Sequence, residues 1–424
     1  MSTIKENDTY KYLSNDTYIL NNKDFYCYIN LPKNLNAGDK FILCLDISTV
    51  LSGTIEFIQC THDAKISNKS GKKNINITDD IVQIELENFY LNFDKEQTNL
   101  IVINFNTKNE LGDYVKSYWI KKKFSIYGNC QPEHITCFLL TNKNFRKYYE
   151  YIEPVGRLVH IMNNDDIKNY YRTLSKISLL IVQPISDTYN NNHLFGTTSL
   201  LNYIKSYDVT VIMIPNLYFS GYSPHVRLIS YKNNFLLHPM PIHDINFLKI
   251  YKDNNRNREK IIDEYIRIIN DPNFYNQKYF EEQVNKSLTE LESRENEAIK
   301  KYGHLINKFI KYSDFVKENY KNVLLCHFPS HPAQFTFIYI SNIILNFINI
   351  TPENYDVNLD PGKSGVLPFY KSIEKNLNFS ITDKDIIVNS YKYDIKQFMN
   401  EYCDAYDKYD INELEQYIKQ SQNN

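Results

Sequence analysis

The stretch from Phe124 to His134 reads FSIYGNCQPEH, which combines a strand, a sharp turn and the start of a helix. A β-branched and aromatic run ends at Gly128, which tolerates a tight turn, and Asn129 tolerates left-handed backbone geometry. Pro132 follows in the expected first helical turn, which proline favours because an amide there lacks a partner within the helix. The stretch therefore predicts a strand that leads directly into a helix, with Cys130 at the junction.

Cys130 is the first candidate for a reactive group. Amides at a helix start carry partial positive charge, so the pKa of a thiol held there is expected to lie below its ordinary value of about 8.5. The alternative is a structural role, because most cysteines in soluble chains are small buried hydrophobic residues. The remaining cysteines are expected to be of that buried kind: Cys27, Cys44, Cys60, Cys137, Cys326 and Cys403.

The composition sets the broad class of the protein. A chain of 424 residues exceeds what one core usually supports, so two domains are expected. The net charge of −2 argues against a dedicated nucleic-acid binder, which would carry a basic excess. Seven cysteines without a CxxC pair fit a reducing compartment and argue against both a disulfide framework and a cysteine zinc site.

The sequence indicates a cytoplasmic protein without an integral membrane segment. Its first residues are polar and lack the apolar core of a signal peptide. The most apolar segment, Phe335 to Ile350, is interrupted by polar residues and is shorter than the ~20 residues that a membrane span needs. This segment is therefore interpreted as a buried helix.

Residues 1–123 are predicted to form an antiparallel β-sandwich. Between Asp24 and Lys123 short alternating runs, such as Phe41 to Ile47, are separated by turn residues, with no helical-period segment between them. No catalytic cluster occurs in this region. It is interpreted as an accessory domain, with a carbohydrate-binding or packing module as the alternative.

Residues 124–424 are predicted to form an α/β domain with a parallel sheet. Near-continuous apolar runs, which a sheet covered on both faces requires, alternate with helical stretches. Residues 254–320 carry an apolar stripe at helical spacing and are interpreted as a helical insertion or lid, with an oligomerisation coil as the alternative. The tail from Thr351 shows no site chemistry. The expected strands are Leu158–Ile161, Ile177–Gln183, Val209–Ile214 and Val323–Cys326.

Polar side chains follow the expected strands at their carboxyl ends, where ligands bind in such folds. A purely structural explanation would not need polar groups at each of these ends. The segments concerned are Gly128–Gln131 (GNCQ), Gln183–Asp187 (QPISD), Pro215–His225, which includes FSGYSPH, and His327–Pro332 (HFPSHP).

Together these four segments resemble the WcbI family of capsular-polysaccharide acetyltransferases, over residues from about 124 to the end. That family is similar in layout to the SGNH hydrolases, in which a Gly-Asp-Ser turn holds the nucleophile and a late His-Pro motif supplies the base. Here Gly128-Asn129-Cys130 and His331-Pro332 stand at those places. The Asp that normally precedes the His by three residues is replaced by Phe328, so the carboxylate that orients His331 must come from elsewhere, with Asp187 as the candidate, or be absent.

The resemblance implies an SGNH-like sheet domain that moves an acetyl group from acetyl-coenzyme A to a sugar or glycan hydroxyl. Its catalytic candidates are Cys130, His331 and Asp187. Cys130 either forms an acetyl-enzyme or only lines the site. Candidate oxyanion or substrate contacts are Asn129, Gln131, Gln183, Ser186, Asn216, Tyr222 and His225. Candidate coenzyme contacts are Gly128 in the turn and the basic residues Arg157, Arg227 and Lys232.

Two other functions stay open. The same turn and His331 suit an SGNH-type carbohydrate ester hydrolase, and both domains suit a non-catalytic glycan-binding protein. No metal cofactor is expected. His238 and His243, with Asp244 beside them, are the candidates for a metal site, but a third confirmed ligand is lacking. The oligomeric state is left open by the sequence.

Overall fold

The computed structural model describes residues 121–410 and 412, except 153–158, 160, 229, 232–233, 236–241, 356–358, 382–385 and 389–390. Before residue 121 it describes the backbone of the strands. Its centre is a five-stranded parallel sheet in the order β11-β10-β12-β13-β18. The strands are β10 (Lys122–Tyr127), β11 (Tyr149–Tyr151), β12 (Leu179–Val182), β13 (Thr210–Met213) and β18 (Lys308–Phe309).

The register of the sheet gathers the loops that follow its central strands. Tyr127 at the end of β10 pairs with Val182 at the end of β12, and Val182 pairs with Met213 at the end of β13. Because the three strands are parallel and end at the same level, the segments after them leave the sheet at one edge. This edge is where the sequence predicts the site.

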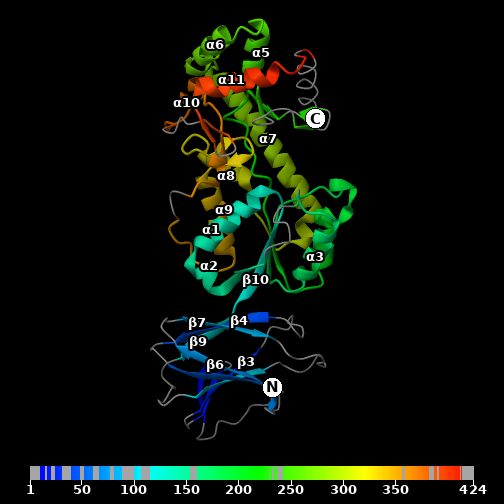
Figure 1. Cartoon of the computed structure of the whole chain (residues 1–424), viewed down its shortest axis with the longest axis vertical. Coiled ribbons are helices and arrows are strands. Elements are labelled where there is room, and N and C mark those ends of the chain that lie inside the picture. Colours follow the sequence, from blue (N-terminus) through cyan, green and yellow to red (C-terminus); the bar gives the residue numbers. More distant parts are fainter. Residues whose placement is uncertain are drawn as a thin grey trace.

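Alternating side chains of the strands bury into two different cores. Phe124 and Ile126 face a core that includes Phe138 of α1 (Cys130–Thr141) and extends to the C-terminal helices. Tyr127 points to the opposite face, where its ring stacks on Tyr170 of α3 (Asn164–Leu174), with ring centroids 5.5 Å apart. Figure 1 shows α1 and α2 (Lys143–Tyr148) on one side of β10 and α3 on the other. The domain therefore has three layers, as a parallel sheet covered on both faces requires.

The expected helices between residues 254 and 350 are present. Phe337 of α9 stacks on Phe138 of α1, so the apolar segment predicted as a buried helix covers the sheet beside the site. Among the described residues no helix has the length and apolar character to cross a bilayer. The helices after α3 are α4 (Thr197–Ile204), α5 (Ile245–Asp253), α6 (Arg258–Asn270), α7 (Gln277–Tyr302), α8 (Tyr312–Asn319), α9 (Gln334–Phe347), α10 (Lys371–Glu374) and α11 (Ile395–Tyr406).

Short strands and 3₁₀ turns complete the C-terminal part. The strands pair as β14 with β17, β15 with β16, β19 with β20, and β21-β22-β23. They are β14 (Val226–Leu228), β15 (Ser230–Tyr231), β16 (Asn234–Phe235), β17 (Ile242–Asp244), β19 (Cys326–Phe328), β20 (His331–Pro332), β21 (Gly365–Val366), β22 (Ile386–Val388) and β23 (Tyr391–Tyr393). The 3₁₀ turns are η1 (Tyr189–Asn191), η2 (His193–Phe195), η3 (Gly303–Leu305) and η4 (Pro361–Ser364).

Two expected strands of the parallel sheet are wrong. The segment predicted at 323–326 ends in β19, which turns back at Pro329 and Ser330 and pairs antiparallel with β20 in a separate hairpin. The fifth strand of the sheet is β18 instead. In the run predicted at 158–161, the described residues Val159 and Ile161 lie in turns, and β11 occupies the edge of the sheet.

Before residue 121 the backbone forms antiparallel strands, as the alternating sequence predicts. The sheets are β3-β8-β5-β6 and β7-β4-β9, with a β1-β2 hairpin. The packing of side chains between these sheets lies outside the described residues, so the sandwich itself stays a prediction. The strands are β1 (Tyr10–Ser14), β2 (Thr17–Leu20), β3 (Asp24–Asn30), β4 (Lys40–Ile47), β5 (Ser52–Cys60), β6 (Ile66–Asn76), β7 (Ile81–Glu87), β8 (Leu100–Asn106) and β9 (Val115–Ile120).

Candidate functional site

Cys130 is the first residue of α1 and is half-buried. Asn129 caps this helix, because its Oδ1 accepts a hydrogen bond of 2.9 Å from the backbone N–H of Gln131. Gly128 is required for space, since a Cβ there would lie 2.7 Å from Cβ of Gln183. The strand, turn and helix predicted from the sequence are thus present, with Cys130 at the edge of the sheet.

Gln131 joins this turn to two distant segments. Its Oε1 accepts from the backbone N–H of Leu217 at 2.9 Å and from Nε2 of Gln183 at 2.8 Å. Its Nε2 donates to the carbonyl oxygens of Leu217 at 3.0 Å and Ser330 at 2.9 Å. The loop after β13 and the β19–β20 hairpin are therefore held against the residue next to Cys130.

Gln183 completes this network. Its side chain is fully buried, and its Nε2 also donates to the carbonyl oxygen of Pro215 at 3.1 Å. The amide donors of both Gln131 and Gln183 are thus occupied by protein acceptors. These bonds argue against the predicted role of the two side chains as oxyanion donors, because each amide already holds the loops together.

The expected low pKa of Cys130 is also wrong. Burial raises the pKa of this thiol above its ordinary value, and the amides of Cys130 and Gln131, which act in the opposite direction, do not outweigh it. The nearby carboxylate of Glu133 raises it further. Cys130 therefore rests as a thiol at neutral pH and needs a base before it can act as a nucleophile. Cys137 on the same helix is exposed, not buried as expected.

Asn216 is exposed on the loop after β13, and its Oδ1 accepts a long hydrogen bond of 3.4 Å from Nδ2 of Asn129. A cavity of about 230 Å³ lies beside it, lined by Pro184 and by residues of α7 that include Arg294 and Lys301. Asn129 and Asn216 stay candidate donors, because their amides face each other next to Cys130. Helix α7, which belongs to the segment predicted as a helical insertion or lid, thus lies beside the strand-end loops.

The β19–β20 hairpin carries two histidines in different settings. His331 is half-buried, its Nδ1 has no hydrogen-bond partner among the described residues, and burial lowers its pKa to about 4. His134, one turn after Cys130 on α1, lies near enough to His331 for its charge to lower the pKa of His331 further. His327, by contrast, is paired with the carboxylate of Asp360, 2.9 Å from its Nε2.

The hydrogen bonds of Asp187 go to Lys301 and Thr198, and none of them goes to His331, the ring that it was predicted to orient. Its Oδ2 lies 2.7 Å from both Nζ of Lys301 and Oγ1 of Thr198, and its Oδ1 accepts from the backbone N–H of Thr198 at 3.1 Å. The carboxylate thus caps α4 and ties it to α7. Ser186 is exposed, and its Oγ contacts Oγ1 of Thr188 at 2.9 Å.

Tyr222 is buried and structural, contrary to the expected substrate contact. Its hydroxyl donates to the carbonyl oxygens of Tyr320 at 2.6 Å and Val323 at 3.1 Å. Burial raises its pKa well above the ordinary value, so the phenol stays neutral.

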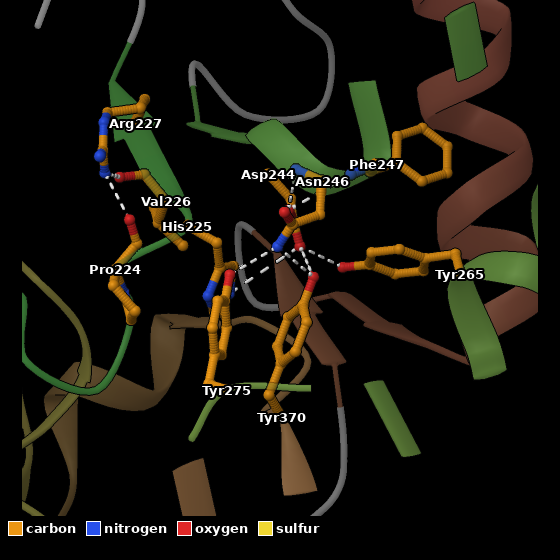
Figure 2. A network of polar contacts seen from close by, with 10 residues as sticks. All are labelled: Pro224, His225, Val226, Arg227, Asp244, Asn246, Phe247, Tyr265, Tyr275 and Tyr370. Atoms are coloured by element: carbon orange, nitrogen blue, oxygen red, sulfur yellow. Dashed lines mark hydrogen bonds and ion pairs between the residues drawn. The ribbon is translucent and has the colours of Figure 1, made fainter. Parts of the chain in front are cut away.

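His225 and Arg227 belong to a separate buried network (Figure 2). Oδ2 of Asp244 accepts from the hydroxyls of Tyr265 at 2.6 Å and Tyr370 at 2.8 Å, and Nε2 of His225 lies 3.8 Å from it. The ring of His225 packs on Tyr370, with centroids 4.1 Å apart. This network stabilises the packing of α5 and α6, and His225 is too buried to contact a substrate.

Arg227 lies at the side of this network and donates from Nη1 to the carbonyl oxygens of Pro224 at 2.8 Å and Val226 at 2.7 Å (Figure 2). One side of its guanidinium is thus occupied by the backbone. Arg157 and Lys232, the other expected coenzyme contacts, lie outside the described residues.

Two residues of the segment considered as a metal site make hydrogen bonds to tyrosine hydroxyls. His243 is buried, with its Nδ1 3.0 Å from the hydroxyl of Tyr406, and Asp244 belongs to the network above. His238 lies outside the described residues. Among the residues that the structure describes, no group of three or more His, Cys, Asp or Glu side chains is arranged to hold a metal ion.

Three residues near the site were missed by the sequence reasoning. His134 stands four residues after Cys130, a helical spacing that places both on one face of α1. Arg294 belongs to a helical insertion whose position over the loops has no local signal. Asp360 precedes the Pro361-Gly362 turn in the tail, where no site chemistry was expected.

Comparisons with known proteins agree with this fold. Residues 123–353 match the family model described as polysaccharide biosynthesis enzyme WcbI. A solved structure of WcbI, described as the native protein without a disulfide bond between coenzyme A and a cysteine, aligns with a TM-score of 0.60 at 18% identity. The alignment covers 72% of this chain and 96% of that one. At this identity the likeness shows a shared fold.

The other comparisons add little. A Clostridium thermocellum endo-1,4-β-xylanase, whose CBM22 and GH10 modules are complexed with xylohexaose, aligns over 77% of this chain and 58% of its own at 12% identity. Its TM-score of 0.17 carries no argument. No curated protein matches the chain.

Proposed function

Because the chain belongs to the WcbI family of polysaccharide biosynthesis enzymes, we propose that it moves an acetyl group from acetyl-coenzyme A to a sugar hydroxyl during assembly of a surface polysaccharide. The observation that carries this proposal is the hydrogen bond from Nε2 of Gln131 to the carbonyl oxygen of Ser330. It holds the segment of Cys130 against the hairpin of His327 and His331, so that a thiol and two imidazoles lie around one group of loops.

The reaction needs a base, oxyanion donors and a place for the coenzyme. An imidazole of the hairpin takes the proton of the attacking hydroxyl, and His331 is the histidine that the family layout assigns to this role. The backbone N–H of Cys130 and the side-chain amides of Asn129 and Asn216 serve as donors to the tetrahedral oxyanion. The loss of one such donor typically costs about 3 kcal/mol of transition-state stabilisation.

The cavity beside Asn216 suits the coenzyme. Arg294 and Lys301 line it and supply positive charge for phosphate groups, although each is also paired with a carboxylate, Arg294 with Glu290 and Lys301 with Asp187. The coenzyme thiol would then lie near Cys130. The resemblance to WcbI supports this placement, because the structure of that protein is described with reference to coenzyme A and a cysteine.

Cys130 has two possible roles that one experiment separates. The full-length protein is incubated with acetyl-coenzyme A and digested, and the peptide of α1 is examined by mass spectrometry. A covalent route adds one acetyl group to Cys130, and the Cys130→Ala variant neither carries the label nor transfers acetyl groups. Cys137→Ala on the same helix is the matched control, because Cys137 is exposed and lies two turns further on. Full activity of Cys130→Ala would exclude the acetyl-enzyme.

Coenzyme binding tests the proposal as a whole. At a hundredfold excess over its dissociation constant, coenzyme A should add about 2.7 kcal/mol of apparent stability, seen as a rise in melting temperature. If coenzyme A does not stabilise the protein and no thiol is released from acetyl-coenzyme A, the transferase proposal is refuted. Cleavage of a chromogenic acetyl ester without coenzyme would instead indicate the ester hydrolase, and glycan binding without any turnover would indicate a binding protein.

A further inference from the structure

His327 and Asp360 form a fixed imidazole and carboxylate pair, and neither residue is among the catalytic candidates predicted from the sequence. Nε2 of His327 lies 2.9 Å from Oδ2 of Asp360, and the two side chains are only 6% and 14% exposed. The other carboxylate oxygen, Oδ1, accepts from the backbone N–H of Gln334 at the start of α9, at 3.1 Å. Both oxygens of Asp360 are therefore held, and the ring of His327 is held through them.

This pairing determines which ring nitrogen of His327 is basic. An ionised carboxylate only accepts hydrogen bonds, so Nε2 carries the proton in the neutral ring and Nδ1 keeps the lone pair. No hydrogen bond to Nδ1 occurs among the described residues, and His327 lines the cavity beside Asp360. The lone pair of Nδ1 is therefore not taken up by a described protein donor.

His331 is held differently. Its ring bonds to the backbone of Gly362. Its Nδ1 is sealed from solvent without a partner, and no carboxylate bonds to the ring among the described residues. Burial lowers its pKa to about 4, which makes it a weak base at neutral pH. Gly365 packs so closely that a Cβ there would lie 3.0 Å from Nδ1 of this ring.

A cavity of about 640 Å³ opens beside the His327 and Asp360 pair, a size typical of small-molecule sites. Its other walls come mainly from the tail and α6, and they combine aliphatic side chains with aromatic rings and charged side chains. Such a lining suits a sugar, whose C–H faces pack on rings while its hydroxyls bond to charged groups. The aromatic and charged lining includes Phe369, Phe379, Tyr393, Lys371, Glu374 and Asp394.

This cavity shares no lining residue with the one beside Asn216. The β19–β20 hairpin connects their surroundings, because His327 lines the cavity beside Asp360 while the carbonyl oxygen of Ser330 accepts from Gln131, next to Cys130. Two separate approaches to one group of loops fit a reaction with two substrates, a donor and an acceptor.

We propose that the cavity beside Asp360 is the acceptor pocket for a sugar, and that His327 is the base which takes the proton of the sugar hydroxyl while Asp360 positions its ring. The inference rests on the proposed acetyl transfer. The hydroxyl proton moves to Nδ1 of His327 as the hydroxyl oxygen bonds to the thioester carbonyl carbon. The carbon–sulfur bond then breaks, and the imidazolium returns the proton to the leaving thiolate, which leaves an acetyl ester and the coenzyme thiol.

The test follows release of the coenzyme thiol from acetyl-coenzyme A by the full chain, with methyl glycosides of glucose, galactose and mannose as acceptors. We expect His327→Gln and the isosteric Asp360→Asn to lower kcat by about a hundredfold or more, because general base catalysis contributes on that order. KM for the glycoside and the thermal shift with coenzyme A should stay as in the unmodified protein. His331→Gln, in the same hairpin, should lower kcat by less than about tenfold.

A substitution in the cavity wall tests the acceptor pocket without changing the proposed base. Ser380 is exposed and lines the cavity, so Ser380→Trp narrows it without disturbing a core. This change should raise KM for the glycoside with an unchanged thermal shift by the coenzyme. Near-normal kcat in Asp360→Asn, an equal loss in His331→Gln, or an unchanged KM in Ser380→Trp would overturn the inference.

The two proposals fail in different ways. If coenzyme A does not stabilise the protein and acetyl-coenzyme A does not lose its acetyl group, the acetyl transfer itself is wrong. If coenzyme A stabilises the protein but none of the glycosides promotes thiol release, the sugar pocket is wrong while the coenzyme site stands.

Discussion

Replacing Gln131 with alanine is expected to lower the free energy of unfolding by about 3 kcal/mol. The Gln131 side chain is almost completely buried, and it makes four hydrogen bonds of 2.8 to 3.0 Å with Gln183, Leu217 and Ser330. At about 1 kcal/mol for each bond, their sum is about 4 kcal/mol. Water that enters the vacated space recovers part of this, which leaves about 3 kcal/mol.

A second substitution separates the hydrogen bonds from the volume of the side chain. Gln131→Glu keeps the shape but puts a carboxylate oxygen where Nε2 now donates to the carbonyl oxygens of Leu217 and Ser330. Two repulsive contacts replace two bonds, so this variant should lose at least as much stability as the alanine variant at neutral pH. The matched control is Gln277→Ala, because Gln277 is exposed on α7 and bonds only to Glu281. It should change stability by less than about 0.5 kcal/mol.

The assay is urea unfolding of the full-length protein, followed by circular dichroism of the helices. All helices of the described residues lie after residue 121, so this signal reports the domain that contains Gln131. Fluorescence of Trp119, the single tryptophan, reports the N-terminal strands separately. A loss below about 1 kcal/mol in Gln131→Ala, or a normal stability of Gln131→Glu, would refute the conclusion that this side chain fixes the loops.

Three further predictions concern single groups near the site. In a Cys137→Ser background, alkylation of Cys130 should rise with a midpoint above the ordinary thiol pKa, because burial raises its pKa; a midpoint below that value would contradict this. The pKa of His331 is 6.5 in the unfolded chain and about 4 in the folded protein, so the unfolded state binds a proton first as the pH drops. The free energy of unfolding therefore falls through this pH window, by at most about 3 kcal/mol. Denaturant unfolding of His331→Gln should show a shallower fall, and an unchanged fall would count against it. Asp187→Ala should lower the free energy of unfolding by about 1–2 kcal/mol, because the helix cap at Thr198 is lost. The rate of thiol release should stay near normal, and a large loss of rate would indicate that Asp187 acts in the reaction.

The part of the site that is local in sequence could be predicted well. A strand, a glycine turn and a capped helix within Phe124 to His134 depend on neighbouring residues, and the structure has all three. The parallel arrangement of β10, β12 and β13 also follows from their apolar runs. These features correctly predicted the edge of the sheet at which Cys130 lies.

The partners of each side chain could not be predicted in the same way. Asp360 lies 33 residues after His327, and only the hairpin and the η4 turn bring them together. The carboxylate expected from the loop at Asp187 is instead bound by Lys301, which comes from a long helix 114 residues away. Polar residues at strand ends predict where a site lies, but sequence spacing does not say which of them face a ligand.

Gln131 and Gln183 show why polar residues at strand ends need not take part in catalysis or ligand binding. Loops at such an edge have backbone amides and carbonyls that no strand satisfies, and a buried group of this kind must find a partner. One glutamine offers both a donor and an acceptor, so it can satisfy the N–H and the carbonyl of Leu217 at once. A glutamine after a strand therefore indicates a loop that needs support as readily as it indicates an oxyanion donor.

The β19–β20 hairpin accordingly has two tasks that depend on the same few residues. Its tip is fixed by Gln131 through Ser330, and its first strand presents His327, which Asp360 holds from the other side. Since the hairpin does not belong to the parallel sheet, its position depends on these two anchors, on its packing against α9, and on a hydrogen bond of 2.9 Å from the backbone N–H of Phe219 to the carbonyl oxygen of Pro329. Loosening the anchor at Gln131 should therefore lower the rate of acetyl transfer even where the domain stays folded, whereas loosening α4 at Asp187 should not.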